Sequence, residues 1–332
     1  MTSASHTHSE TASSNRGELF SLLLRLHAIE PGQVAPGAGH QVQAAFLDIV
    51  RQADPALAEW LHRPNQRRPY AVGLLQGFNH LTKAEVEDAR SKQQAVLVQP
   101  GQTYWLHISI LDATVFGSFA RYLILNPRTL TVRIGDVHFE ISRLVYAPDA
   151  AVPASSWVAY SSFADLCIQS PAQRRYGFEF ASPTAFSRGQ KSWGKMLKVF
   201  PEPHYVFESL ARQWEAFAPV DFRMEARGLA LNPLIEWCEE HVIVTHYTLE
   251  TGYLSFSRFG QVGFQETVTY EVKGPPTALE AQWLSPLARF ALFSGIGYKT
   301  TMGMGQARCI NLAPAPVSIL EDDAKSNKGV TV

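Results

Sequence analysis

The feature that most constrains the fold of this chain is a single order of secondary-structure patterns that occurs twice along it. Apolar periodicity and turn residues delimit each element of the first half. In chain order these elements are a strand at 17–29, a Gly- and Pro-rich loop at 30–39, helices at 41–52 and 55–61, strands at 69–75 and 102–110, a helix from Asp112, and strands at 130–134 and 137–145. Apart from the short second helix, this is the strand–helix–strand–strand–helix–strand order of a ferredoxin-like domain.

The second half repeats the order. Its elements are a strand at 176–181, a helix at 203–217, strands at 241–256 and 263–272 separated by residues 258–262, a helix at 279–294 and a strand at 307–312. The repetition predicts an α+β chain of two tandem ferredoxin-like (RRM-like, βαββαβ) domains, at 17–150 and 151–320, followed near the end by a glycine-rich loop. Residues 1–16 and 321–332 are polar and without apolar periodicity, so we expect disordered tails there.

The composition is that of an ordinary globular protein. Of the 332 residues, 46% are hydrophobic and 18% charged, which suffices for two domain cores. The apolar windows, such as 19–26, are far shorter than the roughly 20 residues of a membrane helix, so we expect no membrane association. Three widely spaced cysteines, Cys167, Cys238 and Cys309, make neither a disulfide framework nor a zinc cluster. We therefore expect a cytoplasmic protein with no metal and no other cofactor.

Positive charge is concentrated in three segments, although the net charge of the chain is −1. Residues 61–70, 171–200 and 289–308 carry net charges of +3, +5 and +3. Such segments bind a polyanion when they form one basic stripe, and are ordinary solvated surface when they do not. Both interpretations stay open for any one segment taken alone.

Four glycines among eleven residues distinguish the segment 295–305, between the last predicted helix and the last predicted strand. Glycines permit positive φ and close backbone approach, so successive N–H groups of such a segment can cradle phosphate oxygens. The segment matches neither a Walker A motif nor a dinucleotide-binding motif. It is either a phosphate-binding loop or a structural turn.

Five stretches, in the same order along the chain, are similar to one known family. They are QADPALAEWLH (52–62), LHRPNQRRPYAVGLL (61–75), FASPTAFSRG (180–189), FPEPHYVFESLARQW (200–214) and LARFALFSGIGYKTTMGMGQAR (287–308). Together they resemble the CRISPR repeat-processing endoribonucleases of the RAMP superfamily, and the glycine-rich stretch is the most specific of the five. The family fold is two tandem ferredoxin-like domains, in agreement with the repeated element order.

The resemblance implies that the chain binds CRISPR repeat RNA and cleaves the precursor into crRNA guides for antiviral defence. It implies a metal-independent reaction, in which a 2′-hydroxyl attacks the adjacent phosphate and leaves 2′,3′-cyclic phosphate and 5′-hydroxyl ends. Such a reaction needs a base, an acid and cations near the phosphorane. Histidine suits the first two roles because its pKa lies near neutrality.

Two of the eleven histidines are candidates for the catalytic group. Family members with a histidine that matches His62 use it, together with a lysine whose position corresponds to Arg67 or Arg68 here. We expect Arg68 to take part in catalysis. His40, at the start of the first long helix, is the alternative, because a helix N-terminus disfavours the imidazolium form and so suits a base.

The residues expected to bind RNA are basic or belong to the glycine-rich loop. They are Arg67, Arg188, Lys191, Lys195, Lys198, Gly297, Tyr298, Lys299, Thr300, Thr301 and Gly303. Arg and Lys side chains would hold phosphates, and Phe186, Trp193 and Tyr298 would stack on unpaired bases. Core packing explains Trp193 about equally well.

The chain departs from the family pattern at one position. Some members carry a catalytic tyrosine in the first helix, where this chain has Leu47. Either Tyr70 or Tyr298 replaces it, or the site works with His and Arg alone. Some relatives bind RNA and cleave it poorly, which makes a weakly active or inactive repeat-RNA-binding subunit of a CRISPR effector complex the alternative function. A third interpretation is a structural protein without RNA. We expect crRNA, and in the alternative effector-complex subunits, as partners of a monomer or homodimer.

Overall fold

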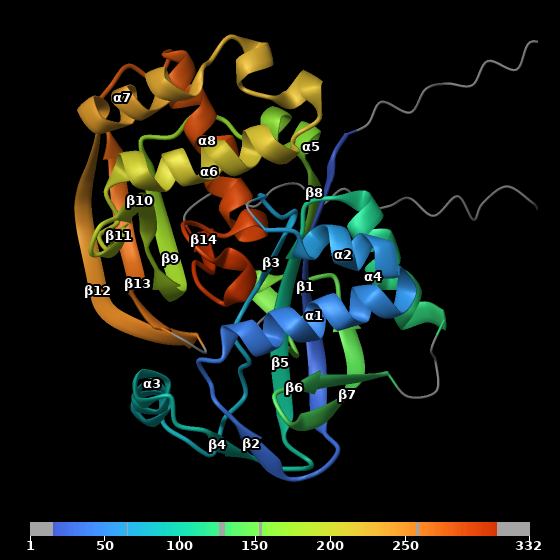
Figure 1. Cartoon of the computed structure of the whole chain (residues 1–332). Coiled ribbons are helices and arrows are strands. Elements are labelled where there is room, and N and C mark those ends of the chain that lie inside the picture. The colour runs from blue at the N-terminus through green and yellow to red at the C-terminus, as the bar shows by residue number, and fades with distance from the viewer. Residues whose placement is uncertain (1–15, 65, 126–129, 153–154, 257–258, 311–332) are drawn as a thin grey trace, which may run out of the picture.

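The computed structural model describes residues 16–64, 66–125, 130–152, 155–256 and 259–310. Within them, two α+β units lie side by side, and each packs helices against an antiparallel sheet (Figure 1). The tails predicted to be disordered lie outside the described residues except for Arg16, which forms an ion pair with Asp165.

The first sheet is built around β1 (Glu18–Ala28), a strand with a continuous run of buried side chains over Leu19–Leu24, all apolar except Ser21. Its other strands are β3 (Tyr70–Val72), β5 (Thr103–Ile110), β6 (Thr131–Ile134), β7 (Val137–Val145) and β8 (Ala159–Ser162). The strand order is β3-β5-β1-β7-β6, and β8 pairs with the start of β1. The helices of this unit are α1 (Gly39–Ala53), α2 (Pro55–His62) and α4 (Ala113–Leu125), and α1 and α4 pack on the sheet.

The second sheet has the order β12-β13-β9-β14. Its strands are β9 (Arg175–Thr184), β12 (Val242–Phe256), β13 (Phe259–Val272) and β14 (Ala307–Cys309), and its helices are α6 (Pro203–Phe217), α7 (Leu231–His241) and α8 (Leu279–Ser294). In both sheets the first strand of the repeated order lies between the third and the fourth. This arrangement confirms the predicted pair of ferredoxin-like units.

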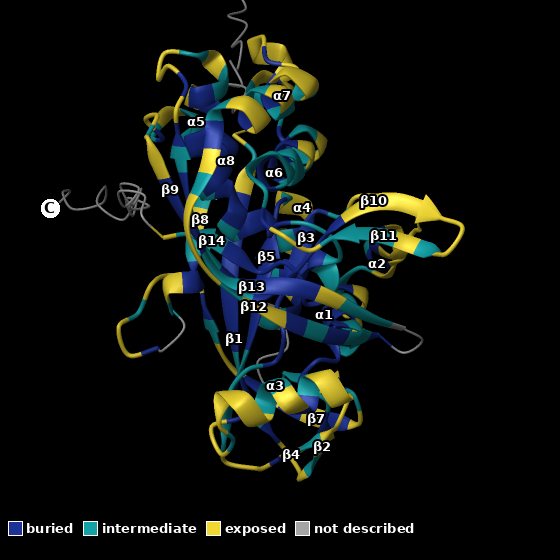
Figure 2. Cartoon of the chain, turned by 90° about the vertical axis from the view of Figure 1, so that its left-hand side faces the viewer, coloured by how far each residue is buried: buried dark blue, intermediate teal, exposed yellow. Residues whose placement is uncertain are grey.

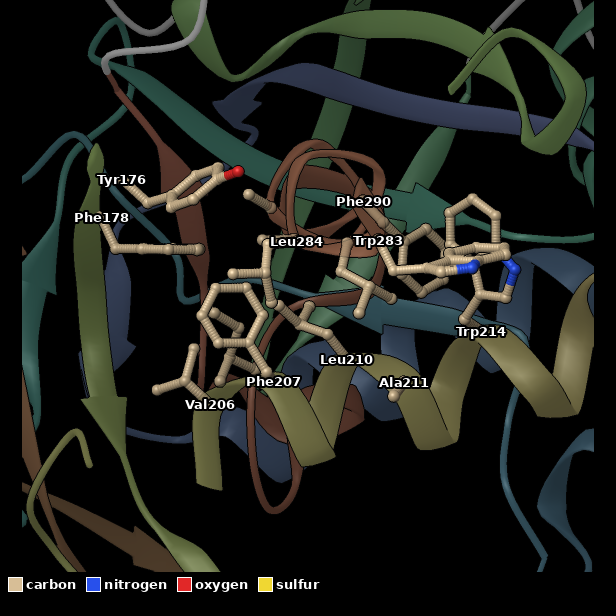
Figure 3. Close-up of a cluster of buried hydrophobic side chains, with 14 of the residues drawn as sticks. Tyr176, Phe178, Val206, Phe207, Leu210, Ala211, Trp214, Trp283, Leu284 and Phe290 are labelled. Atoms are coloured by element: carbon tan, nitrogen blue, oxygen red, sulfur yellow. The ribbon is translucent and has the colours of Figure 1, made fainter. Parts of the chain in front are cut away.

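Aromatic side chains dominate the core between α6, α8 and the second sheet (Figure 3). Phe207, Leu210 and Trp214 lie on one face of α6, at successive spacings of three and four residues, as helical periodicity requires. The Trp214 ring meets Phe290 of α8 edge-on, with centroids 5.2 Å apart, and its indole N–H donates to the Phe222 carbonyl at 2.8 Å. The predicted helices at 203–217 and 279–294 are therefore confirmed by their packing.

Several elements have no counterpart in the sequence-based prediction. They are β2 (Gly32–Val34), α3 (Lys83–Lys92), β4 (Val96–Val98), β8, α5 (Phe163–Ile168), β10 (Phe186–Lys191), β11 (Gly194–Lys198), α7 and the short 3₁₀ turns η1 (Ser155–Trp157), η2 (Val220–Phe222) and η3 (Glu225–Arg227). Helix α3 lacked a signal because it is polar and buries only Ala89. A capping box between Thr82 and Glu85 begins it instead. β2 lies in the stretch predicted as a loop and pairs with β4.

Some predicted boundaries are wrong. The strand predicted from residue 263 begins at Phe259, and the strand predicted over 69–75 is confined to Tyr70–Val72. His241 ends α7 and does not start a strand. The expected domain boundary at residue 150 stays a prediction. β8, which lies beyond it, pairs with the first sheet.

The hairpin of β10 and β11 projects from the second unit, with β10 largely exposed and β11 mostly half-buried (Figure 2). Within the part of the chain that the structure describes, no helix has the length and apolar character needed to cross a membrane.

Candidate functional site

The glycine-rich loop at 295–305 leaves α8 in a conformation that only glycine tolerates at several points. Gly297 and Gly305 have φ values of 93° and 69°. A Cβ atom on Gly305 would lie 2.0 Å from the Ile296 carbonyl oxygen, so no other residue fits there. Lys299 is one of the few non-glycine residues with positive φ, at 59°, and directly precedes the 3₁₀ turn η4 (Thr300–Met302).

This loop belongs to the second unit but packs on the first helix of the first unit. The Met302 carbonyl lies so close to Gly39 that a Cβ there would be 1.7 Å from its oxygen. The Gln43 side-chain amide donates to Thr301 Oγ1 at 3.1 Å and to the Tyr70 hydroxyl at 3.0 Å. Helix α1 and the glycine-rich loop therefore form one contact surface between the two units.

His40 and Lys299 lie on the two sides of this contact, near enough for the charge of Lys299 to act on His40. His40 lies in the first turn of α1, and its pKa is lowered from the ordinary value by burial and by the positive charge of Lys299. Its Nδ1 is buried and has no hydrogen-bond partner among the described residues. The lowered pKa makes the neutral imidazole the dominant form of His40 at pH 7.

The pKa of Lys299 is also shifted from its ordinary value. Burial, with a smaller effect of the Lys195 charge, lowers the pKa of Lys299 to about 8. Its Nζ lies 3.8 Å from the centroid of the Phe256 ring, in a cation–π contact. The ammonium group is thus still mostly protonated at neutral pH, yet is a stronger acid than an ordinary lysine.

An open groove of about 530 Å³ lies beside this contact. Its lining residues are Arg67, Phe186, Ser187, Arg188, Tyr205, Glu208, Ser209, Arg212, Gly297 and Tyr298. They come from the segment after α2, from the hairpin, from α6 and from the glycine-rich loop. The groove thus carries three guanidinium groups, those of Arg67, Arg188 and Arg212, and one carboxylate, that of Glu208. Glu208 forms ion pairs with Arg188, at 2.9 Å, and with Arg212, at 2.8 Å. The groove is therefore suited to an anionic ligand.

Arg67 reaches this groove from the other unit. Burial and the neighbouring charge of Arg212 lower the pKa of Arg67. Both effects disfavour an isolated charge, and a phosphate between the two guanidinium groups would relieve them.

The hairpin joins the groove to the loop. Lys195 Nζ lies 4.2 Å from the centroid of the Tyr298 ring, so β11 contacts the residue before Lys299. Lys191 is exposed and Lys198 half-buried. Trp193, at the tip of the hairpin, is 72% exposed, so it is not a core residue.

The structure gives the other candidate residues different surroundings. His62 is exposed at the end of α2. Arg68 Nε donates to the Leu61 carbonyl at 2.7 Å, and its guanidinium reaches the His62 carbonyl at 3.4 Å, so this side chain caps the end of the helix. Tyr70 is 1% exposed and packs on Phe46, which leaves it no access to a large substrate.

Two residues of the predicted RNA-binding set, Thr300 and Gly303, pack against the protein interior. Thr300 is buried, and a Cβ on Gly303 would lie 2.3 Å from a Leu74 methyl carbon. Their predicted contact with RNA stays a prediction, and the packing gives each a structural role. By contrast, Gly297 and Tyr298 open onto the groove.

Sequence reasoning missed three residues of this region: Gln43, Arg212 and Phe256. Arg212 lies one helical turn after Glu208, within the stretch 200–214 that resembles the family. A search for a cation four residues after each carboxylate of that helix would have found it. Gln43 and Phe256 carried no signal, because their importance depends on which unit they touch. Among the described residues, no group of three or more His, Cys, Asp or Glu side chains is arranged to hold a metal ion.

Two ferredoxin-like units, with a glycine-rich loop of the second docked on the first helix of the first, define a RAMP-like protein of the CRISPR systems. Residues 19–167 match the model of the CRISPR Cas6 N-terminal domain, and residues 178–307 match that of the CRISPR-associated endoribonuclease Cas6. The chain belongs to the Cas6 family.

Individual relatives agree with this assignment. A Cas6 endoribonuclease of Mycobacterium tuberculosis (strain CDC 1551 / Oshkosh) is 32% identical over 154 residues, or 46% of this chain and 45% of that protein. The chain thus matches slightly less than half the length of that relative. A Cas6 of Thermus thermophilus, solved as a product complex, superposes with a TM-score of 0.69 at 23% identity over 88% of this chain and 100% of that one. A second Cas6 product complex has a TM-score of 0.61 at 26% identity, over 88% and 99%.

Proposed function

We propose that this protein is an endoribonuclease that binds CRISPR repeat RNA and cleaves the precursor transcript into crRNA guides. The observation that carries the proposal is the pairing of a neutral His40 with a charged Lys299 beside a groove lined by Arg67, Arg188 and Arg212. Membership of the Cas6 family supports it. So do relatives whose structures are described as product and substrate-mimic complexes.

In the proposed reaction the RNA attacks itself. The His40 imidazole takes the proton of the 2′-hydroxyl, the O2′–P bond forms and the P–O5′ bond breaks. The Lys299 ammonium stabilises the negative phosphorane and gives a proton to the leaving 5′ oxygen. The products are a 2′,3′-cyclic phosphate and a 5′-hydroxyl, and the step needs no metal. Acid–base catalysis of this kind contributes roughly 10²–10⁴-fold.

The groove and the hairpin would hold the RNA. Arg67, Arg188 and Arg212 suit phosphates because a guanidinium group donates two parallel hydrogen bonds to them. The exposed Trp193 suits stacking on an unpaired base, and Lys191 is available to the backbone beside it. The binding surface would thus extend from the cleavage site along the projecting hairpin.

The first experiment incubates the purified protein with labelled repeat RNA from its own locus in EDTA. A second RNA carries a single 2′-deoxy substitution at the cut site. Cleavage in EDTA that the deoxy substitution abolishes supports the proposed reaction. Tight binding without cleavage of either RNA supports the alternative, a repeat-binding subunit of an effector complex. Absence of binding contradicts both.

A pair of variants then separates the two histidines. We expect His40→Ala to slow cleavage by roughly 10²–10³-fold, because the base is lost. We expect His62→Ala to stay within about threefold, since the exposed His62 side chain is far less constrained than His40. The reverse order would assign catalysis to His62.

A further inference from the structure

One side chain connects the two units at the proposed catalytic pair. Gln43 lies one turn after His40 in α1 and is only 8% exposed. Its amide nitrogen donates to the Tyr70 hydroxyl on β3 and to Thr301 on the glycine-rich loop. A buried amide with two such partners is costly to displace, because each lost bond leaves a buried polar group unpaired.

The loop end of this bridge is close to Lys299. Thr301 lies in the single 3₁₀ turn that follows Lys299, and the Met302 N–H closes that turn on the Lys299 carbonyl at 2.9 Å. The hydrogen bond from Gln43 therefore holds the turn that carries Lys299. On the helix side, the same turn presses on Gly39, the neighbour of His40.

We propose that Gln43 is a positioning residue that holds the Lys299 turn against the first turn of α1, so that Lys299 and His40 act as one acid–base pair. The inference rests on the proposed function, since it assigns that pair its chemistry. Gln43 itself touches neither RNA nor the reacting atoms in this scheme. It acts through Thr301.

A packing role alone would have different consequences. The charge of Lys299 acts on His40 only while the two groups stay close, because Coulomb interactions weaken with distance and hydration. Release of the turn would bring the pKa of His40 back up towards its ordinary value. A packing change that leaves His40 buried and Lys299 beside it would lower the stability of the protein and leave this titration unchanged.

The first test titrates His40 by NMR in protein without RNA, with the His40→Asn variant used to assign its signal. Gln43→Met removes the amide at nearly constant volume. Thr301→Val removes the acceptor hydroxyl, and Thr301→Ser keeps it. We expect the pKa of His40 to rise in Gln43→Met and Thr301→Val, and to return to the wild-type value in Thr301→Ser. The Thr301 pair decides the question if Gln43→Met does not fold.

The second test measures single-turnover cleavage of repeat RNA at saturating protein from pH 5 to 9. We expect Gln43→Met to lower the rate by roughly tenfold, because the pair is misplaced, and to change the Kd for RNA by less than about twofold. The acidic limb of its pH profile should move to higher pH. The matched control is Gln52→Met on the exposed face of the same helix, which should match the wild type.

The outcomes separate this inference from the proposed function. An unchanged His40 titration in both Gln43→Met and Thr301→Val overturns the positioning role, whatever the enzyme cleaves. An equal loss of rate and RNA affinity with an unshifted pH profile also overturns it. If the wild-type protein does not cleave repeat RNA, the proposed function fails, and the RNA-free titration still decides whether Gln43 holds Lys299 near His40.

Discussion

A Cβ atom on Gly39 would lie 1.7 Å from the carbonyl oxygen of Met302. The first residue of α1 and the last residue of the turn after Lys299 are therefore in contact at a distance that only glycine permits. This contact brings together two segments from opposite ends of the described chain. It also places the first turn of α1 beside the turn that follows Lys299.

Gly39→Ala should separate the two units locally. We expect a loss of about 1–3 kcal/mol of stability from the enforced overlap, and slower RNA cleavage because the loop moves away from His40. Urea unfolding and single-turnover kinetics measure the two effects. The control is Gly117→Ala in the exposed part of α4, where an added Cβ meets nothing within 4 Å. It should be neutral or stabilising, and an equal loss in both variants would contradict the importance of the contact.

The rate of cleavage should depend on pH in a bell shape. The pKa of His40 is lowered from its ordinary value of 6.5, so the neutral imidazole persists into mildly acid solution. The rate should fall on the acid side only when the pH drops below this lowered pKa. Lys299, with a pKa of about 8, loses its proton above that pH, and the rate should fall again. Single-turnover rates from pH 5 to 9 test both limbs.

Lys299→Arg provides the control for the alkaline limb. A guanidinium stays protonated throughout this range and is too weak an acid to give its proton to the leaving oxygen. The variant should therefore cleave far more slowly, and its residual rate should keep the acidic limb and lose the alkaline fall. An alkaline fall at the same pH in Lys299→Arg would assign that limb to another group.

The cations of the groove should contribute to binding through phosphates. We expect Arg212→Ala and Arg67→Ala each to weaken RNA binding at all sequences, and each to reduce the slope of log K against log salt by about 1. Binding titrations at several salt concentrations measure the slope. Arg133→Ala, at an exposed position of the edge strand β6 outside the groove, should leave the slope unchanged. An equal change in all three variants would indicate a diffuse charge effect.

Two tryptophans should respond in opposite ways. Trp214 is fully buried in the core of the second unit, so Trp214→Ala should cost about 3–5 kcal/mol of stability. Trp193 is 72% exposed, so Trp193→Ala should leave stability unchanged and weaken RNA binding by about 1–3 kcal/mol through a lost stacking contact. Denaturant unfolding and RNA titration of both variants separate the roles. Unchanged RNA binding in Trp193→Ala would remove the hairpin tip from the interface.

The long, strongly periodic elements were predictable because their signal is local. Residues 203–217 and 279–294 are helical as predicted, since their apolar side chains recur at helical spacing and pack on one sheet. Helix α3 and the strands β2 and β4 were not predictable in this way. A polar helix that buries one residue and strands of three residues have no apolar periodicity. The segment that forms the hairpin of β10 and β11 was identified as part of a basic run, but its two strands were not predicted.

The sequence by itself determined the order of the strands and helices that form the two ferredoxin-like units, and the backbone freedom of the glycine-rich loop. Each of these depends on neighbours within a few residues. Only the tertiary structure decided that the loop meets α1, that the charge of Lys299 acts on His40, and that Gln43 joins α1 to the loop. The physical reason is that burial and charge interactions depend on distances in space between segments far apart along the chain, which no local pattern records.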